Sequence, residues 1–594
     1  IIQGLALPST TGPWSAQELL FMADRINDGV LTEAGGDALE FVRRELGRTH
    51  GTFRAGGEIN LEARGHGNPE QFIVREDYIR PWNLAKNPAD LNFEGWITPY
   101  GYGLWTFSIG NSLYNKPVDR YNGGSLMAGS AYFGETAFSS NLPFIKPGTG
   151  DFSANFPVRG FASAGWAGRN SGFNLTVGRD RLSWGPGESG NLLVGSHIEY
   201  HDNGRLSFFN DKIKWTFSVS AFPYPDEYYR GTWTPPADPA PANPNHLERK
   251  WNLFYAIADP TGQAGTGDSD SFDGVNLFIA HRFEWRLFNR LNMALTEAIM
   301  YQDEEGYVNL AALSPFTFLH HLFRRFNSNS ILSFEADWAP VPRLNLYSAV
   351  VADEFALPGV EPQPGLADRA KPNSFGWLLG AKTAFPLRLG KVLGMFTASL
   401  EGVWTSPYLY LRSSSGADAE TENYKRGLDF VVANRYTFSE GVFYGEDFLG
   451  YRWGGDAIAI NGRAGWDVYG KVRLGVNFLF LVHGTFDKYT VYNEVNVSKP
   501  PYNSTTPTGA HPNNGAASGD PSYQYASNYA DPAAVGRDAV SYTQALSLSG
   551  SWTFWGALAL YGEIDLVHVI HPRNYSSSPP ATDLQWTLGL TYGF

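Results

Sequence analysis

Apolar and polar residues alternate along the last eleven residues of the chain. Phe594, Tyr592 and Leu590 are apolar or aromatic, as is every second position back to Leu584, whereas the intervening residues are Gly, Thr or Gln. A period of two places these two sets on opposite faces of a β-strand. Such a strand, ending in an aromatic residue, is typical of the closing strand of an outer-membrane β-barrel. The last strand of a soluble sandwich is the alternative, because it also alternates.

The same period recurs upstream, over residues 102–109, 171–178, 471–483, 541–554 and 558–570. Short turns alternate with long polar stretches, of which the longest lie near residues 223–245, 262–273, 413–423 and 489–539. Bacterial barrels pair tight periplasmic turns with long outside loops. The pattern therefore predicts an all-β transmembrane fold, a closed antiparallel outer-membrane barrel of about 16–18 strands.

The first fifty residues follow a helical period instead. Ser15-Ala-Gln-Glu18 is a capping box, and the apolar residues from Leu19 to Ile26 share one broad helical face. A second short helix is expected from about Asp37, with Gly47 as its C-cap. We divide the chain into residues 1–50, a helical plug or lid on the periplasmic side, and residues 51–594, the barrel with long extracellular loops. A helical hairpin packed on itself is the plainer alternative.

The composition agrees with a barrel. The 594 residues are 15% aromatic, contain no cysteine and have a mean hydropathy of −0.27. The sequence contains no run of about 18 apolar residues that could form a spanning helix. In a barrel the apolar surface comes from every second residue, so no such run is needed. The net charge of −14 argues against nucleic-acid binding. Residues 1–5 lack the features of a signal peptide, so we expect a mature chain whose export signal has been removed.

Charges on the polar faces of strands indicate a wet lumen, because charge that faces lipid is costly. The residues predicted to face the lumen are Glu284, Arg286, Glu335, Asp337 and Asp353. Glu297 instead shares its phase with Met293, Leu295 and Ile299. Either a bulge intervenes there, or the interior of that strand is apolar. A structural ion-pair network is the main interpretation of this set, and direct ligand contact is the alternative.

One segment, Gly178-Arg-Asp-Arg-Leu-Ser-Trp-Gly-Pro-Gly187 followed by 191–196, resembles the Wzi-like capsule-assembly family of outer-membrane barrels. Further pieces fit in order, and these are Arg282–Arg286 with Glu297, Leu313–Phe316, Asn327–Ser330 and Val351–Phe355. The resemblance covers about a third of the chain. It implies helices that close the periplasmic side of a barrel, and a non-enzymatic protein that holds surface polysaccharide through extracellular loops and rim aromatics.

The same segment has a physical interpretation. Pro186 fixes a tight turn, and Trp184 is expected at the membrane boundary, where its N–H stays wet. Arg179 and Arg181 share the phase of the outward residues 173–177, so either they reach the headgroup zone or a bulge turns them inward to line a sugar or ion path. The candidate ligand-binding residues are Arg179, Arg181, Trp184, Glu284, Arg286, Glu297 and Asp353.

Binding or assembly of surface polysaccharide in the bacterial outer membrane is the first functional hypothesis. A porin that prefers cations, because of the excess of acids, is the alternative, and a hydrolase at the barrel rim is a third, although no Gly-x-Ser-x-Gly elbow occurs. His320 and His321 are adjacent and lack a third ligand, so we expect no metal, no other cofactor and no catalytic residue. The expected partners are the bilayer with its lipopolysaccharide-type lipids, the polysaccharide, and the barrel-assembly machinery through the strand that ends at Phe594.

Overall fold

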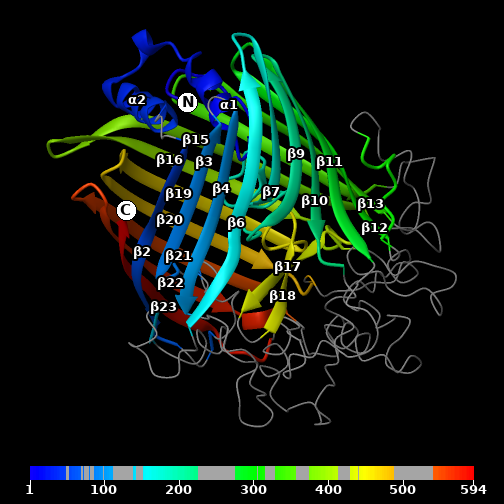
Figure 1. The fold of residues 1–594 in the computed structure, drawn as a ribbon. Coiled ribbons are helices and arrows are strands. Elements are labelled where there is room, and N and C mark those ends of the chain that lie inside the picture. The colour runs from blue at the N-terminus through cyan, green and yellow to red at the C-terminus, as the bar shows by residue number, and fades with distance from the viewer. Residues whose placement is uncertain are drawn as a thin grey trace.

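The computed structural model is a closed antiparallel β-barrel with two helices at one end (Figure 1). It describes residues 1–47, 52–68, 71–72, 79–80, 86–97, 100–111, 138–141, 152–224, 274–303, 306–314, 328–355, 373–411, 428–438, 441–486, 488, 539–574 and 576–594. The polar stretches 262–273 and 413–423, most of 223–245 and 489–539, and the pair His320-His321 lie outside these residues.

The barrel wall has 18 strands within the described residues, at the upper end of the predicted range. They are β2 (Phe53–His66), β3 (Ala89–Ile97), β4 (Gly101–Asn111), β6 (Phe152–Ala167), β7 (Ser171–Asp180), β9 (His201–Asn210), β10 (Ile213–Phe222), β11 (Val275–Leu287), β12 (Leu291–Asp303), β13 (Ser328–Val341), β14 (Leu344–Glu354), β15 (Ser374–Leu389), β16 (Val392–Thr405), β19 (Ala457–Val468), β20 (Val472–His483), β21 (Ser541–Phe554), β22 (Leu558–Ile570) and β23 (Ala581–Gly593). The wall closes where β2 pairs with β23.

Three smaller pairings complete the sheet structure. The segment β5 (Phe138–Ser140) pairs with β2 beyond the end of β3. The strands β17 (Val431–Phe438) and β18 (Gly441–Phe448) form a separate hairpin, and β1 (Thr11–Gly12) pairs with β8 (Ser183–Trp184). This last pair brings the N-terminal segment against the segment that carries the Wzi-like resemblance.

The predicted alternation is confirmed on β23. Leu584, Leu588 and Tyr592 expose 51%, 52% and 48% of their surface on the outer wall, whereas Asp583 and Gln585 are buried inside. Outward Leu560, Ile564 and Leu566 on β22 and Leu474, Val476 and Phe478 on β20 repeat the pattern. An apolar outer wall over paired backbone is the arrangement that lipid requires. Closure of the sheet rules out the soluble sandwich.

Two helices lie at the top of the view in Figure 1, at the end where short turns join the strands. The Ser15 N-cap of the predicted capping box is confirmed, since the Ser15 hydroxyl accepts a hydrogen bond from the Glu18 amide at 3.1 Å ahead of α1 (Ala16–Ala23). The Glu18 carboxylate pairs with Lys214 instead of completing the box. The second helix, α2 (Glu33–Gly47), begins four residues before Asp37. No helix in the described part of the chain is long and apolar enough to cross a membrane.

Both helices are docked on the barrel, so they are not a hairpin packed only on itself. The rings of Phe21 on α1 and Phe209 on β9 meet edge to face, with centroids 5.4 Å apart. Phe41 on α2 stacks on Tyr469 in the β19–β20 turn at 6.1 Å. The division of the chain at residue 50 stays a prediction.

Candidate functional site

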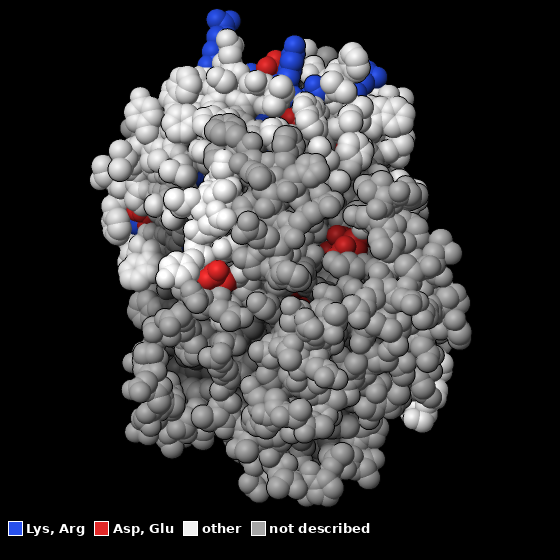
Figure 2. Space-filling view, turned by 90° about the vertical axis from the view of Figure 1, so that its right-hand side faces the viewer, with Lys and Arg blue, Asp and Glu red and all other residues white. Residues whose placement is uncertain are grey.

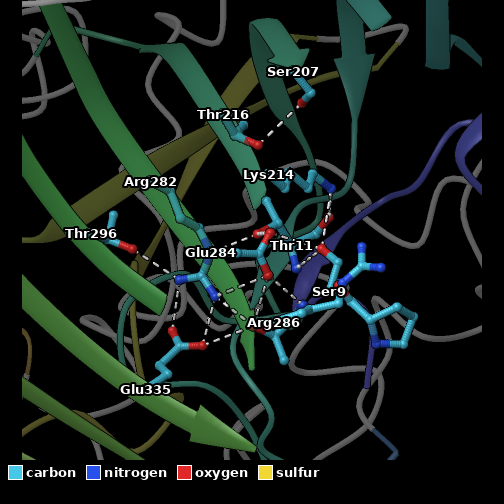
Figure 3. A network of polar contacts seen from close by, with 12 residues as sticks. Ser9, Thr11, Ser207, Lys214, Thr216, Arg282, Glu284, Arg286, Thr296 and Glu335 are labelled. Carbon is cyan, nitrogen blue, oxygen red and sulfur yellow. Dashed lines mark hydrogen bonds and ion pairs between the residues drawn. The ribbon is translucent and has the colours of Figure 1, made fainter. Parts of the chain in front are cut away.

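The N-terminal segment runs inside the barrel, against the inner faces of β11 and β13 (Figure 3). The Glu284 carboxylate accepts hydrogen bonds from the Ser9 hydroxyl at 2.9 Å, the Thr10 amide at 2.8 Å and the Thr11 hydroxyl at 2.8 Å. Asp337 accepts one from the Leu7 amide at 2.7 Å. Carboxylates on the wall therefore hold an extended backbone segment in the lumen.

Arg282 is the centre of this network. Its guanidinium is fully buried and donates two hydrogen bonds to Glu335, at 2.8 and 2.6 Å. It also donates to the Thr10 and Thr11 hydroxyls at 2.5 and 2.6 Å. A buried ion pair is maintained only when additional hydrogen bonds satisfy its remaining polar atoms. The N-terminal segment supplies those bonds, so the segment and the pair depend on each other.

A second buried ion pair ties α1 to the same site. The Lys214 amine on β10 lies 2.7 Å from the Glu18 carboxylate, and the two side chains expose only 2% and 3% of their surface. Lys214 also donates to the Ser9 hydroxyl at 3.2 Å. The helical element and the inserted segment are thus fixed to the barrel wall by one connected set of charges.

The segment that carries the Wzi-like resemblance is folded into the lumen. Trp184 is completely buried, and its backbone amide donates to the Val194 carbonyl at 3.0 Å. The prediction that Trp184 lies at the membrane boundary with a wet N–H is therefore wrong. Gly185 has φ of +136°, and a Cβ there would meet the Asn191 side chain at 2.4 Å, so the tight turn requires glycine at this position.

A carboxylate on β16 anchors the next part of this segment. Glu401 accepts hydrogen bonds from the backbone amides of Glu188 and Ser189 at 2.8 and 2.9 Å. It also accepts one from the Tyr347 hydroxyl on β14 at 3.0 Å. Lys382 on β15 lies 3.1 Å from the Glu188 carboxylate. Glu401 therefore holds residues 188 and 189 by hydrogen bonds, as Glu284 holds residues 9–11.

Residues 406–411, which follow β16, form the third inserted segment. Asp353 on β14 accepts a hydrogen bond from the Tyr410 amide at 3.0 Å. The Tyr410 hydroxyl donates to the Leu192 carbonyl and accepts from the Tyr451 amide at 3.1 Å. Burial raises the pKa of Tyr410, because the charged phenolate is disfavoured away from water. The neutral hydroxyl thus joins three segments that are far apart in sequence.

Apolar side chains fill the space around these anchors. Leu192, Leu193 and Val194 belong to a continuous buried cluster. Its wall members include Val351 on β14, Leu378 on β15, Val403 on β16, Leu479 on β20 and Val567 on β22. The residues inserted from 7–12, 181–200, 406–411 and 449–453 are named here the plug. The plug packs as a protein core against much of the inner wall.

The other predicted site residues have different surroundings. Arg286 points to the inserted segment, with its Nε donating to the Pro8 carbonyl at 2.6 Å. Arg179 pairs with Asp202 at 2.8 Å and lies over the Tyr200 ring, and Arg181 is exposed and donates to the Glu199 carbonyl. These contacts fit a structural role for both arginines.

Glu297 lies on the outer face of β12, where it is in register with His281 of β11 and shares the side of exposed Leu295. The β11–β12 pairing runs without a register shift, and the inner face of β12 carries Asn292, Ala294, Thr296, Ala298 and Met300 rather than the set that includes Glu297. Both predicted explanations for Glu297, a bulge or an apolar interior, are therefore wrong. It stands apart from the lumen residues Glu284, Arg286 and Asp353.

Several residues of the site were not among the predicted ones. Arg282 shares the phase of Glu284, so alternation alone could have placed it in the lumen. Glu401 could have been found in the same way, because it shares the inward phase of Val403 and follows outward Leu400. Ser9, Thr10 and Tyr410 lie outside regular strands, and no periodic signal indicates where they go.

Comparison with known proteins gave structural neighbours only. No protein-family profile and no curated protein sequence matches the chain. Wzi of Escherichia coli, an outer-membrane protein involved in group 1 capsule assembly and a carbohydrate-binding β-barrel, is a similar solved structure. It has 10% identity and a TM-score of 0.49, over 99% of this chain and 95% of that one.

Porins are further similar structures. OccD1 (OprD) has 9% identity and a TM-score of 0.35 over 91% of this chain and 95% of that one. OpdQ of Pseudomonas aeruginosa has 8% identity and a TM-score of 0.35 over 92% and 99%. These structures indicate likeness of fold alone, so the ligand of this chain must be argued from its own residues. Among the described residues, no group of three His, Asp or Glu side chains is placed to hold a metal ion.

Proposed function

We propose that the chain is a non-enzymatic protein of the bacterial outer membrane that binds surface polysaccharide at its long-loop end. The plug carries this proposal. Three carboxylates, Glu284, Glu401 and Asp353, hold separate inserted segments, and an apolar core surrounds them. A lumen filled in this way opposes the free diffusion on which a porin depends, and leaves the loop end as the surface for a large ligand.

Two further observations support the proposal. The residues that resemble the Wzi-like family, 178–187 and 191–196, run from the end of β7 into the plug. The short turns and helices share one end of the barrel, and in bacterial barrels short turns face the periplasm. Under the proposal α1 and α2 face the periplasm, and sugar rings stack on rim Tyr and Trp side chains outside.

Conductance and polysaccharide binding together test the proposal. The full chain in planar bilayers is expected to be silent, and in nanodiscs it is expected to retain purified envelope polysaccharide but not neutral dextran. Steady conductance without polysaccharide retention would reject the binding role in favour of the porin. Turnover of lipid or ester substrates by the purified chain would instead support a hydrolase.

A further inference from the structure

The short-turn end of the barrel carries a ring of cations. Seven turns of two or three residues are fully described at this end, and six of them contain a Lys or Arg. The six are Arg169, Lys212, Arg290, Arg343, Lys391 and Lys471. Asp211 is the one acid in these described turns. Figure 2 shows Lys and Arg side chains projecting at the top of the view, the end where the helices lie.

The charge of this ring is available to a ligand. All six side chains are exposed. Two helix acids at the same end face other arginines, since Asp28 lies 2.7 Å from Arg43 and Glu33 lies 3.4 Å from Arg388. Of the six cations, Lys471 shares a pocket with the helix acids Asp37 and Glu40. A protein with a net charge of −14 thus concentrates positive charge on one edge. Concentration of one sign on one edge indicates a partner of the opposite sign.

The ring borders the lipid-facing surface of the barrel. Ile213 follows Lys212 directly and is 45% exposed on the outer wall. Val341, two residues before Arg343, and Val392, directly after Lys391, are 51% and 48% exposed. Phe288, in the turn of Arg290, is 90% exposed. Long basic side chains at the edge of an apolar surface reach the headgroup zone of a bilayer.

We infer that Arg169, Lys212, Arg290, Arg343, Lys391 and Lys471 bind the phosphates of anionic phospholipids in the leaflet next to the short turns. The cations are continuous with the apolar outer wall, and this favours a lipid over a soluble polyanion. The phosphate of a lipid can contact the cations while its acyl chains contact the apolar wall. The inference does not depend on polysaccharide binding, which involves the opposite end of the barrel.

Spin-labelled lipids measure this selectivity directly. The full chain is reconstituted in equal parts of phosphatidylcholine and phosphatidylglycerol, and the motionally restricted fraction of each label is compared by electron paramagnetic resonance. We expect phosphatidylglycerol to be enriched about twofold or more at the protein surface, and the enrichment to fall with added salt. Replacing all six cations by Gln should bring the ratio close to one.

Two further sets of variants serve as controls. Exchanging Arg for Lys and Lys for Arg at the same six sites keeps the charge and should keep the enrichment. Two triple Gln variants, at 169, 212 and 290 and at 343, 391 and 471, should each lose part of it, and they replace the six-site variant if that fails to fold. Enrichment that survives in the Gln variants, or is absent from the wild type, overturns the inference. Binding of soluble dextran sulfate without any lipid preference overturns it as well.

Discussion

Arg282 on β11 and Glu335 on β13 are joined by two hydrogen bonds across the intervening strand β12. The pair reaches over a neighbour because all three strands turn their polar faces inward, and Thr296 of β12 accepts a third hydrogen bond from the same guanidinium at 2.9 Å. The N-terminal segment then covers the pair. Wall and plug are therefore one polar structure at this point.

Removal of one partner should be costly. Glu335→Leu leaves the Arg282 guanidinium buried without its carboxylate, and such a change destabilises proteins by about 3–5 kcal/mol. The free energy of unfolding in urea, followed by tryptophan fluorescence in lipid vesicles, checks this. The double variant Arg282→Met/Glu335→Leu should lose less than Glu335→Leu alone. An equal or greater loss in the double variant would show that the charge pair is not the cause.

Truncation inside the plug should resemble a core mutation. Trp184→Ala removes a completely buried indole, and such changes cost about 3–5 kcal/mol. The control is Trp555→Ala, in the β21–β22 turn, whose side chain is 88% exposed. The melting temperature in detergent should fall only for Trp184→Ala. Planar-bilayer recordings of the same variant should show transient openings. Equal effects of the two changes would contradict the burial of Trp184.

Gly178, at the end of β7, should not accept a side chain. It has φ of +134°, and a Cβ would lie 2.3 Å from the Gly160 carbonyl oxygen of β6, so Gly178→Ala forces the wall strand to move. Gly204→Ala is the control on the neighbouring strand β9, where a Cβ would meet nothing within 4 Å. We expect the folded fraction, measured by heat-modifiable gel mobility, to drop for Gly178→Ala alone. If both variants fold equally, the tight approach of β6 and β7 is not present.

Alkaline pH should loosen the plug. The pKa of Tyr410 is raised by burial, so the folded state holds its proton after an unfolded tyrosine, with a pKa of about 10, has lost it. The contribution of Tyr410 to stability is therefore complete below that pH and is lost as pH rises above it. Tyr410→Phe should flatten the fall in unfolding free energy above about pH 10. The control is Tyr307→Phe, which replaces a tyrosine that is 69% exposed.

Alternation predicted the wall well because a barrel repeats one local rule. The outward face of Leu584, Leu588 and Tyr592 follows from sequence spacing alone, and so does the inward position of Glu284. The Ser15 N-cap is equally local. Trp184 could not be placed in this way, because its burial is set by Val194 and by strands up to several hundred residues away. The phase of Glu297 indicates that it lies on the outer face. The general rule that carboxylates avoid a lipid-facing surface argued for the opposite position.

Closure of the wall by β2 and β23 has a consequence for assembly. Gly57 and Phe594 exchange backbone hydrogen bonds at 3.1 and 3.0 Å, so this seam forms only once β23 is in place beside β2. Most of the wall residues that hold the plug through polar contacts lie on β10, β11, β13, β14, β15 and β16, away from the seam. His483 on β20 adds a contact to the Trp453 carbonyl at 2.9 Å. These strands can therefore fold around the plug residues that they hold, as an open trough. The seam then closes a structure whose interior is already partly occupied.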